Sequence, residues 1–251
     1  MTLGSLDGKV AFISGASRGL GAGLAECFAE AGLRLVLCSR TSPALAASET
    51  VLASSLDVRD EKALDALVDQ AEERFGAIDI WINNAGVLDP IRPIREVSLE
   101  DFREHIDVNL SGVFVGSRAY VRHLRRLGKA GVLINLSSGA AWNAYAGWGA
   151  YCAGKAGVER LTEVLAIEEA KIGLRAHSVA PGVIDTAMQT RIRASSANDF
   201  PDVGHFKERK QNGDFNTVRY VAEEFLAIAF DPDRKPETVA VRIEDEPRSR
   251  G

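Results

Sequence analysis

The chain has 251 residues, of which 46% are hydrophobic and 26% charged, and its mass is 27.0 kDa. These proportions are those of a globular protein with one large domain or two small ones, and they exclude a disordered chain. Because no apolar run approaches the roughly 20 residues that a membrane-spanning helix needs, we expect no membrane partner. The net charge of −5 and the pI of about 5.5 predict no nucleic-acid partner, since surfaces that bind a phosphate backbone are basic.

Short apolar runs alternate with segments of helical periodicity. In chain order, the pattern predicts a strand at 9–14, a helix at 20–31, strands at 33–38 and 51–58, a helix at 61–75, a strand at 78–82, a long helix at 99–127, a strand at 132–136, a second long helix at 150–172, and strands at 174–179 and 238–243. Strands rich in Val, Ile and Leu that alternate with helices are typical of a parallel sheet buried on both faces. Right-handed crossovers then give a doubly wound α/β fold with about seven strands.

No break rich in Pro, Gly or Ser separates two cores, so we interpret residues 1–251 as a single domain. The polar segment 199–216 is predicted to be an irregular loop or lid, and the mixed charges of 244–251 predict a solvated tail.

Cysteine is sparse and odd in number, at Cys27, Cys38 and Cys152. The set provides neither a disulfide framework nor a C-x-x-C pair for zinc, so we expect no metal site. The first residues do not show the charged and then apolar segments of a secretory signal. A reducing, cytoplasmic setting is therefore expected.

A glycine-containing turn joins the first predicted strand to the first helix. Glycine is needed in such a turn for tight bending, for close approach of the backbone to a pyrophosphate and for packing of the helix on the strand. The helix N-terminus also presents free N–H groups to an anion. An ordinary strand–helix turn is the alternative, but the structural context favours a dinucleotide site. The predicted contacts in this loop are Gly15, Ser17, Arg18, Gly19, Leu20 and Gly21.

The end of the second strand bears on the choice of dinucleotide. A carboxylate that holds the ribose hydroxyls of NAD is missing there, and Ser39 and Arg40 stand in its place. Arg40 could pair with the 2′-phosphate of NADP, with Arg18 as a second positive charge, although both arginines could simply be solvated. The sequence therefore favours NADP. Asp57 and Val58, after the third strand, could reach the adenine, or Asp57 could serve the N-terminus of the next helix.

Tyr151 and Lys155 lie four residues apart in a predicted helix, so their side chains share one face. A nearby ammonium favours the phenolate and lowers the pKa of a tyrosine, which makes the pair a candidate general acid with its electrostatic partner. Ser138 follows the strand at 132–136, and its hydroxyl could hold a carbonyl oxygen of the substrate. Ser137 is the competing candidate.

These residues belong to an ordered set that resembles the short-chain dehydrogenase/reductase family along nearly the whole chain. Two small departures are Ser14, where the family often has threonine, and a short segment after Arg40, which predicts an abbreviated second crossover helix. The matching motifs are Gly15-x-x-x-Gly19-x-Gly21, Asp57-Val58, Asn83-Asn84-Ala85-Gly86, Asn109, Ser138, Tyr151-x-x-x-Lys155 and Pro181-Gly182-x-x-x-Thr186.

The resemblance implies a Rossmann-type fold, a homodimer or homotetramer formed through the two long helices, and a role for each motif. Tyr151 would donate a proton to a carbonyl oxygen, Lys155 would bind the nicotinamide ribose and lower the pKa of Tyr151, Ser138 would orient the carbonyl, and Asn109 would hold a relay water. No metal is required, and His105 receives no role. The other implied cofactor contacts are Asn84, Ala85, Gly86, Pro181, Gly182, Val183, Ile184, Thr186 and Met188.

Within the family, residues 137–155 are similar to sepiapterin reductases, and residues 180–189 to that group and to the related benzil reductases. This implies NADPH-dependent reduction of a ketone or vicinal dicarbonyl, with residues 186–216 covering the substrate. Arg242 stands where pterin-reducing relatives carry an acid, with Asp245 three residues on, which argues against a pterin. An alcohol or 3-oxoacyl dehydrogenase/reductase and a non-catalytic dinucleotide-binding regulator are the alternatives.

Aromatic side chains between Ser138 and Tyr151 could wall a substrate pocket. Packing in the core or between subunits is the alternative, most of all for Trp148. The predicted substrate contacts are Ser138, Trp142, Tyr145, Tyr151 and Gln189.

Overall fold

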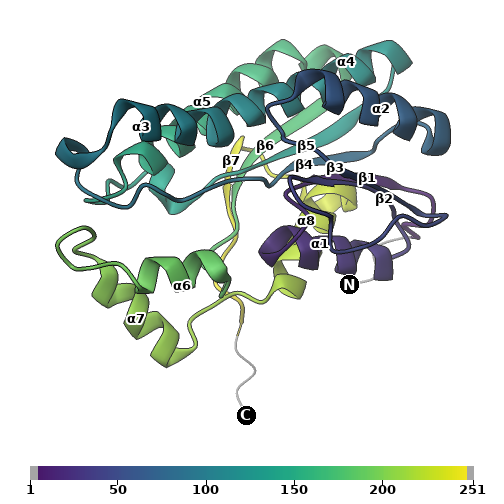
Figure 1. The fold of residues 1–251 in the computed structure, drawn as a ribbon. Helices are drawn as coiled ribbons and strands as arrows, with labels where there is room; N and C mark the ends of the chain where they lie inside the picture. The colour runs from purple at the N-terminus through teal and green to yellow at the C-terminus, as the bar shows by residue number, and fades with distance from the viewer. Residues whose placement is uncertain (1–4, 248–251) are drawn as a thin grey trace.

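The structure, a computed structural model, describes residues 5–247, and the predictions for the first four residues and for 248–251 lie outside this range. Within it, seven parallel strands form one sheet in the order β3-β2-β1-β4-β5-β6-β7. The doubly wound fold is therefore confirmed (Figure 1). The strands are β1 (Val10–Ser14), β2 (Arg34–Ser39), β3 (Val51–Ser55), β4 (Ile80–Asn83), β5 (Gly131–Leu136), β6 (Leu174–Ala180) and β7 (Ala240–Arg242).

Helices cover both faces of the sheet. Figure 1 shows α2, α4 and α5 on one face, α1 and α8 on the other, and α6 and α7 as a pair at the same end of the molecule as α3. No helix in the described range is long and apolar enough to span a membrane. The helices are α1 (Gly19–Glu30), α2 (Glu61–Phe75), α3 (Leu99–Ile106), α4 (Gly112–Leu127), α5 (Gly149–Glu168), α6 (Ala187–Arg193), α7 (Val203–Asn212) and α8 (Val218–Phe230).

Alternation along the strands divides the apolar side chains between two cores. In β1, Ala11 and Ile13 face α1 and α8, whereas Val10 and Phe12 face α2 and α4. The ring of Phe12 stacks on that of Trp81 with 3.5 Å between centroids. Because both faces are buried, the strands carry the continuous apolar runs that predicted them.

The strand order reverses between β1 and β4, and this switch point positions the site. Ligands of open α/β sheets bind outside the carboxyl ends of the strands at such a point. The glycine loop follows β1, Asn84 follows β4, Ser138 lies two residues after β5 and Pro181 follows β6. The sheet thus brings motifs far apart in the sequence to one edge.

The long helix predicted at 99–127 is interrupted. One π-helical turn, Asp107–Ser111, joins α3 to α4, and Asn109 is buried within it. Single π-turns of this kind are frequent at functional sites. The helix predicted at 150–172 likewise ends at Glu168 and continues only as the short 3-10 turn Ala170–Ile172.

One other prediction needs correction. The segment 199–216 is not irregular, because α7 lies within it and buries Val203 and Phe206. The described part of the predicted tail, 244–247, is exposed except at the half-buried Glu246, whose two carboxylate oxygens accept hydrogen bonds from Thr217 before α8. The abbreviated second crossover is confirmed, because no helix separates β2 from β3.

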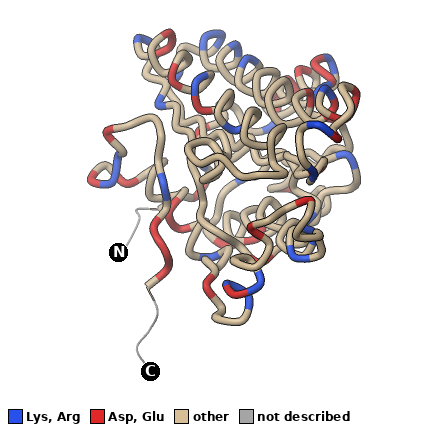
Figure 2. Tube along the Cα trace, turned by 90° about the vertical axis from the view of Figure 1, so that its left-hand side faces the viewer, with Lys and Arg blue, Asp and Glu red and all other residues tan. Residues whose placement is uncertain are grey.

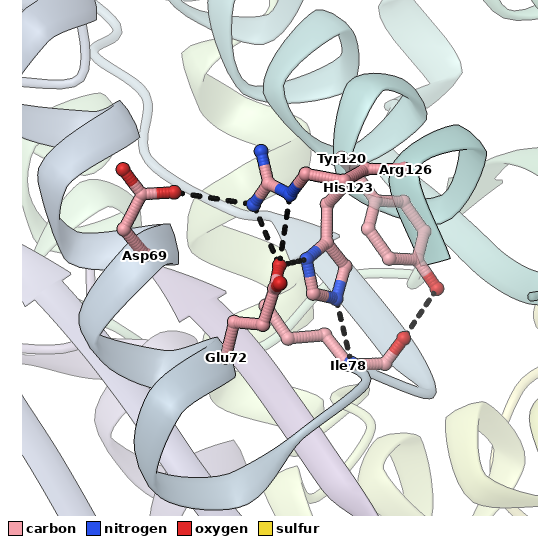
Figure 3. A network of polar contacts seen from close by, with 6 residues as sticks. All are labelled: Asp69, Glu72, Ile78, Tyr120, His123 and Arg126. Atoms are coloured by element: carbon pink, nitrogen blue, oxygen red, sulfur yellow. Dashed lines mark hydrogen bonds and ion pairs between the residues drawn. The ribbon is translucent and has the colours of Figure 1, made fainter. Parts of the chain in front are cut away.

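A buried polar network ties α4 to α2 and to the start of β4 (Figure 3). The fully buried imidazole of His123 accepts a hydrogen bond at Nε2 from the Ile78 amide, 3.0 Å away, and its Nδ1 lies 3.0 Å from Glu72. Arg126 adds an ion pair to the same carboxylate at 2.6 Å. Burial lowers the pKa of His123, so the ring is neutral at pH 7. The network lies on the helix layer, away from the sheet edge that carries the motifs.

Charges of both signs are interspersed along the surface helices (Figure 2). Some of them fasten α6 and α7 to the chain around them. Arg193 on α6 lies 3.1 Å from Asp185, Lys210 on α7 lies 2.5 Å from the same carboxyl group, and Arg191 lies 2.8 Å from Asp89. Ion pairs at or near the surface, such as these, fix the position of the two helices more than they add to stability.

Candidate active site

The glycine loop is bound to the end of β4 by hydrogen bonds. The side-chain amide of Asn84 donates to the carbonyl oxygens of Ser14 and Gly15, at 2.9 and 3.3 Å. The Ser14 hydroxyl accepts from the backbone amides of Asn84 and Ala85 at 3.1 Å each. The hydroxyl kept at this position in place of the family's threonine therefore has a structural role.

The loop leaves no room for larger residues. A Cβ on Gly15 would lie 2.8 Å from Ala85 Cα, and one on Gly21 would lie 2.4 Å from both Asn84 Nδ2 and the Gly15 carbonyl oxygen. Gly19, with φ of +58°, begins α1, and a Cβ there would lie 3.5 Å from Thr186 Cγ2. Thr186, which follows β6, therefore lies next to the loop that follows β1.

The N-terminus of α1 has the features of an anion site. Arg18, at the N-cap position, makes no side-chain bond to the first turn, which contains no acidic residue. The first amides and the positive end of the helix dipole are therefore free for a phosphate group. The free amides of α1 and the glycine backbone of the loop, which carries no Cβ atoms, both fit the pyrophosphate of a dinucleotide.

The end of β2 carries a buried serine and an exposed arginine. The Ser39 hydroxyl donates to the Thr41 carbonyl at 2.7 Å. Arg40 is exposed and forms no ion pair within residues 5–247, although its charge acts on the Asp57 carboxyl. Asp57 instead pairs with Arg59, whose guanidinium holds the pKa of that carboxyl below its usual range. The helix α2 is capped by Asp60, so Asp57 is not its N-cap. A Cβ on Gly112 would lie 2.8 Å from Val58, which places Val58 against the start of α4.

Tyr151 and Ser138 are brought into contact although thirteen residues separate them. Tyr151 is 8% exposed, and burial raises the pKa of its phenol above the ordinary value of 10.0, opposed by a hydrogen bond to the Ser138 side chain. Ser138 also accepts from the Ala140 amide at 3.2 Å, which caps the turn Gly139–Ala141. The Ser137 hydroxyl is buried without a hydrogen-bond partner in the described range. The contact favours Ser138 over Ser137.

Lys155 lies one turn along the same face of α5. Its Nζ donates to the Leu136 carbonyl at 2.7 Å and lies 5.7 Å from the centre of the Tyr151 ring. Burial lowers the pKa of this ammonium from 10.5 to about 8. The expected acidification of the phenol is not seen in the protein alone, because the burial of Tyr151 has the larger effect. Two of the three Nζ donors have no acceptor among the described residues.

Asn109, in the π-turn, is held by backbone and side-chain partners. Its Oδ1 accepts from the Val87 amide at 2.9 Å, and its Nδ2 lies 2.8 Å from the Val87 carbonyl and 2.6 Å from His105 Nε2. His105 is 1% exposed, and its ring lies edge-on to that of Tyr151 at 6.0 Å between centroids. Sequence reasoning assigned His105 no role, and the available signal was its spacing of four residues from Asn109.

An apolar cluster surrounds Tyr151 on the side of α6 and α7. Trp148 stacks on Phe200 at 4.5 Å between centroids and meets Phe206 and Tyr151 at 5.5 Å each. Tyr145 meets Trp148 at 5.1 Å. We call this set the aromatic cluster; its buried members are Leu88, Ile91, Ala140, Trp148, Tyr151, Ile192, Phe200, Val203 and Phe206, with Tyr145, Cys152 and Met188 at its margin.

Other residues singled out in the sequence lie outside the cluster. Trp142 is 43% exposed, and its Nε1 donates to Glu159 on α5 at 2.8 Å. Arg242 and Asp245 are exposed, and the Asp245 carboxylate lies 3.9 Å from Arg209 on α7. Gln189 is buried on α6, and its Oε1 has no partner in the described range.

The loop after β6 meets the segment that precedes α8. The Asn216 side chain donates to the Pro181 carbonyl at 3.1 Å, and the Asn216 amide donates to that of Val183 at 2.9 Å. Gly182 has φ of +76°, and a Cβ there would lie 2.4 Å from Asn216 Nδ2. Ile184 joins the core that faces α1. No group of three or more metal-ligating side chains occurs within residues 5–247.

The chain is similar to known proteins over the segment that carries these motifs. The sequence model described as short chain dehydrogenase matches residues 9–197. The chain belongs to the short chain dehydrogenase family, and it is an oxidoreductase of that family. Among relatives, 3beta-hydroxysteroid dehydrogenase 1 of Eggerthella lenta is 39% identical over 191 residues, which cover 72% of each chain. The benzil reductase ((S)-benzoin forming) of Bacillus cereus is 30% identical over 250 residues, covering 94% of this chain and 100% of the relative.

A solved structure of the family carries a ligand. Carveol dehydrogenase from Mycobacterium avium in complex with NAD matches with a TM-score of 0.80 and 28% identity, over 96% of this chain and 97% of that one. The similarity of fold therefore extends over nearly the whole chain.

Proposed function

We propose that the protein reduces an apolar ketone or vicinal dicarbonyl with a nicotinamide dinucleotide, NADPH in preference to NADH. The observation that carries the proposal is the contact of the Tyr151 phenol with Ser138 at the edge of the aromatic cluster. The glycine loop, with its bare backbone and uncapped helix, supports a dinucleotide at the switch point.

Each polar side chain has a task in this reaction. Ser138 and Tyr151 hydrogen-bond the carbonyl oxygen, and Tyr151, whose raised pKa keeps it protonated at neutral pH, donates the proton. The two free donors of Lys155 would hold the ribose hydroxyls next to the nicotinamide. The bound dinucleotide supplies the hydride. The Asn109 side chain binds the π-turn to the backbone of Val87 and so holds these two segments of the site together.

The aromatic cluster sets the substrate class. Its partly buried members, Tyr145, Cys152 and Met188, carry no charge, and a polyol would leave its hydroxyl groups unpaired beside them. An aryl or alicyclic ketone loses apolar area from water there instead, at about 25 cal/mol per Å². Residues 186–216, which include α6 and α7, would cover this substrate.

A panel of carbonyl compounds tests the proposal. We expect NADPH oxidation with aryl and alicyclic ketones and with vicinal diketones, and a much lower kcat/KM with sugars and 3-oxoacyl thioesters. Turnover confined to sugars or oxoacyl compounds would favour the alternative dehydrogenase/reductase assignment. Dinucleotide binding without turnover of any compound would favour a regulator.

Arg40 is expected to select the 2′-phosphate. It is exposed at the end of β2 next to Ser39, and it forms no ion pair in the part of the chain that the structure describes. An arginine–phosphate pair is worth more than a neutral hydrogen bond, so Arg40→Asp is expected to shift the NADPH/NADH ratio of kcat/KM by about tenfold or more towards NADH. Arg34→Asp, at the opposite end of β2, makes the same charge change and should leave the ratio unaltered. An unchanged ratio in Arg40→Asp would contradict the assignment.

We also infer a homo-oligomer, dimer or tetramer, formed through α4 and α5. Both helices expose apolar side chains: Phe114 on α4 is 45% exposed, and Val164 and Ile167 on α5 are 42% and 80% exposed. Together with a groove lined by Leu110, Phe114 and Leu161, they form an apolar surface that a second copy would cover. Light scattering should give two or four times the chain mass of 27.0 kDa, and the mass of a single chain would contradict the inference.

A further inference from the structure

The orientation of the Asn109 carboxamide is fixed by the backbone of one residue. The Val87 amide can only donate, and it lies 2.9 Å from Asn109 Oδ1. The Val87 carbonyl can only accept, and it lies 2.8 Å from Asn109 Nδ2. The oxygen and nitrogen of the carboxamide are therefore unambiguous, and the second hydrogen of Nδ2 is the one directed at His105 Nε2, 2.6 Å away.

This orientation determines the tautomer of His105. Since Nδ2 donates, Nε2 must be the unprotonated acceptor, and the ring hydrogen must reside on Nδ1. At the other side of the ring, Nδ1 lies 2.8 Å from the Asp89 carbonyl oxygen, which can only accept. Both neighbours thus require the same neutral form of the imidazole.

His105 and Asn109 together form the surface on which α5 rests. Gly154 lies between Tyr151 and Lys155 in the sequence of α5, and a Cβ on it would lie 3.5 Å from Asn109 Cβ and 3.6 Å from His105 Nε2. A displaced imidazole or carboxamide would therefore move the turn of α5 that carries the proposed proton donor.

We propose that His105 is a positioning residue whose neutral imidazole, through Nε2, holds the Asn109 carboxamide in place and thereby sets the position of Tyr151 and Lys155 on α5. The inference rests on the proposed function for its effect on turnover. Its structural part, the tautomer and the Asn109 contact, is independent of it.

The charges around the imidazole oppose its protonation. The ring faces Tyr151 and the ammonium of Lys155 on α5. The Asp89 carboxylate, the one acid within residues 5–247 whose charge acts on the ring, is itself paired with Arg191 of α6. Burial, the largest influence, and the Lys155 charge hold the pKa of His105 below its ordinary value of 6.5, against the hydrogen bond to Asp89. A proton on Nε2 would set two donors against each other, so turnover is present above this pKa and is lost as the pH falls through it.

Two substitutions and a matched control test the inference. His105→Gln keeps an acceptor near Nε2 that does not titrate, and His105→Phe keeps the ring and removes both hydrogen bonds. We expect His105→Phe to lower kcat about fivefold to tenfold with little change in the KM for the dinucleotide. His105→Gln should stay within about threefold of the parent and lose the acid limb of the pH profile.

His123→Gln is the control. His123 is an equally buried imidazole that also accepts at Nε2, but it lies in the network between α2 and α4 (Figure 3). The control should lower the melting temperature and leave kcat and the acid limb unchanged. An unchanged kcat in His105→Phe, an acid limb retained in His105→Gln, or an acid limb altered equally by His123→Gln would each overturn the inference.

A readout without turnover separates this inference from the proposed function. Long-range ¹H–¹⁵N spectra of the protein near pH 7.5 should show His105 as the neutral Nδ1–H tautomer, with a slowly exchanging Asn109 side-chain amide that exchanges faster in His105→Phe. This result together with no turnover of any ketone would refute the proposed function alone. An Nε2–H tautomer or a charged ring would refute the role of His105.

Discussion

Tyr151→Phe is expected to lower the kcat for ketone reduction by about 10²- to 10⁴-fold, the range that a positioned general acid contributes. The substitution removes the hydroxyl that meets Ser138 and keeps the ring that packs against Trp148. The fold and the affinity for the dinucleotide should therefore be retained, as measured by thermal unfolding and by fluorescence titration with NADPH. The loss should appear in single-turnover rates.

Tyr220→Phe is the matched control for this substitution. Tyr220 lies on α8, on the opposite face of the sheet from α5, and it is not one of the site residues. Its substitution should leave kcat unaltered. Equal turnover in Tyr151→Phe and the parent would remove the proton donor from the proposal, whereas a parallel loss of dinucleotide binding would indicate a structural role.

Lys155→Met is expected to have the second largest effect, a loss of about 10²-fold in kcat/KM. Two mechanisms contribute to it. The ammonium donates to the Leu136 carbonyl, which would be left unpaired in the buried site, and its remaining donors would no longer hold the dinucleotide. Lys62→Met, on the exposed side of α2, makes the same exchange at the surface and should have no effect. A dinucleotide affinity unchanged in Lys155→Met would contradict the second mechanism.

The pH dependence of dinucleotide binding should report the same lysine. Burial lowers the pKa of Lys155 to about 8, so the side chain is charged below that pH and loses its charge as the pH rises through it. The affinity of the protein for the dinucleotide should therefore decline above about pH 8 in the parent. In Lys155→Met, affinity should be weak and flat across the same range, and a decline that persists there would assign it to another group.

Much of the site is determined by spacings within short segments. The glycines at 15, 19 and 21 and the four-residue interval between Tyr151 and Lys155 require only a strand, a turn and a helix to place them. Alternation of strands and helices then gives the parallel sheet. A parallel sheet brings the carboxyl ends of its strands to one edge, and this does not depend on the loop sequences. The sequence therefore predicts the fold, the switch point and the polar side chains that gather there.

The helix α7 shows where local pattern is insufficient. It buries only Val203 and Phe206 among ten mostly polar residues, so its periodicity is too weak to distinguish it from a loop. Its partner Trp148 lies more than fifty residues earlier, and the stacking of Trp148 on Phe200 becomes visible only when the chain is folded.

What the sequence by itself determined is the set of motifs, their order along the sheet edge and the family they belong to, because each motif depends on neighbours within a few residues. The tertiary structure alone decided how buried Tyr151 is, and hence that burial rather than Lys155 dominates its pKa. It also decided that His105 reaches Asn109 in one tautomer, and that the aromatic cluster closes on Tyr151. Desolvation and hydrogen-bond direction depend on every group packed around an atom, and those groups come from distant parts of the chain.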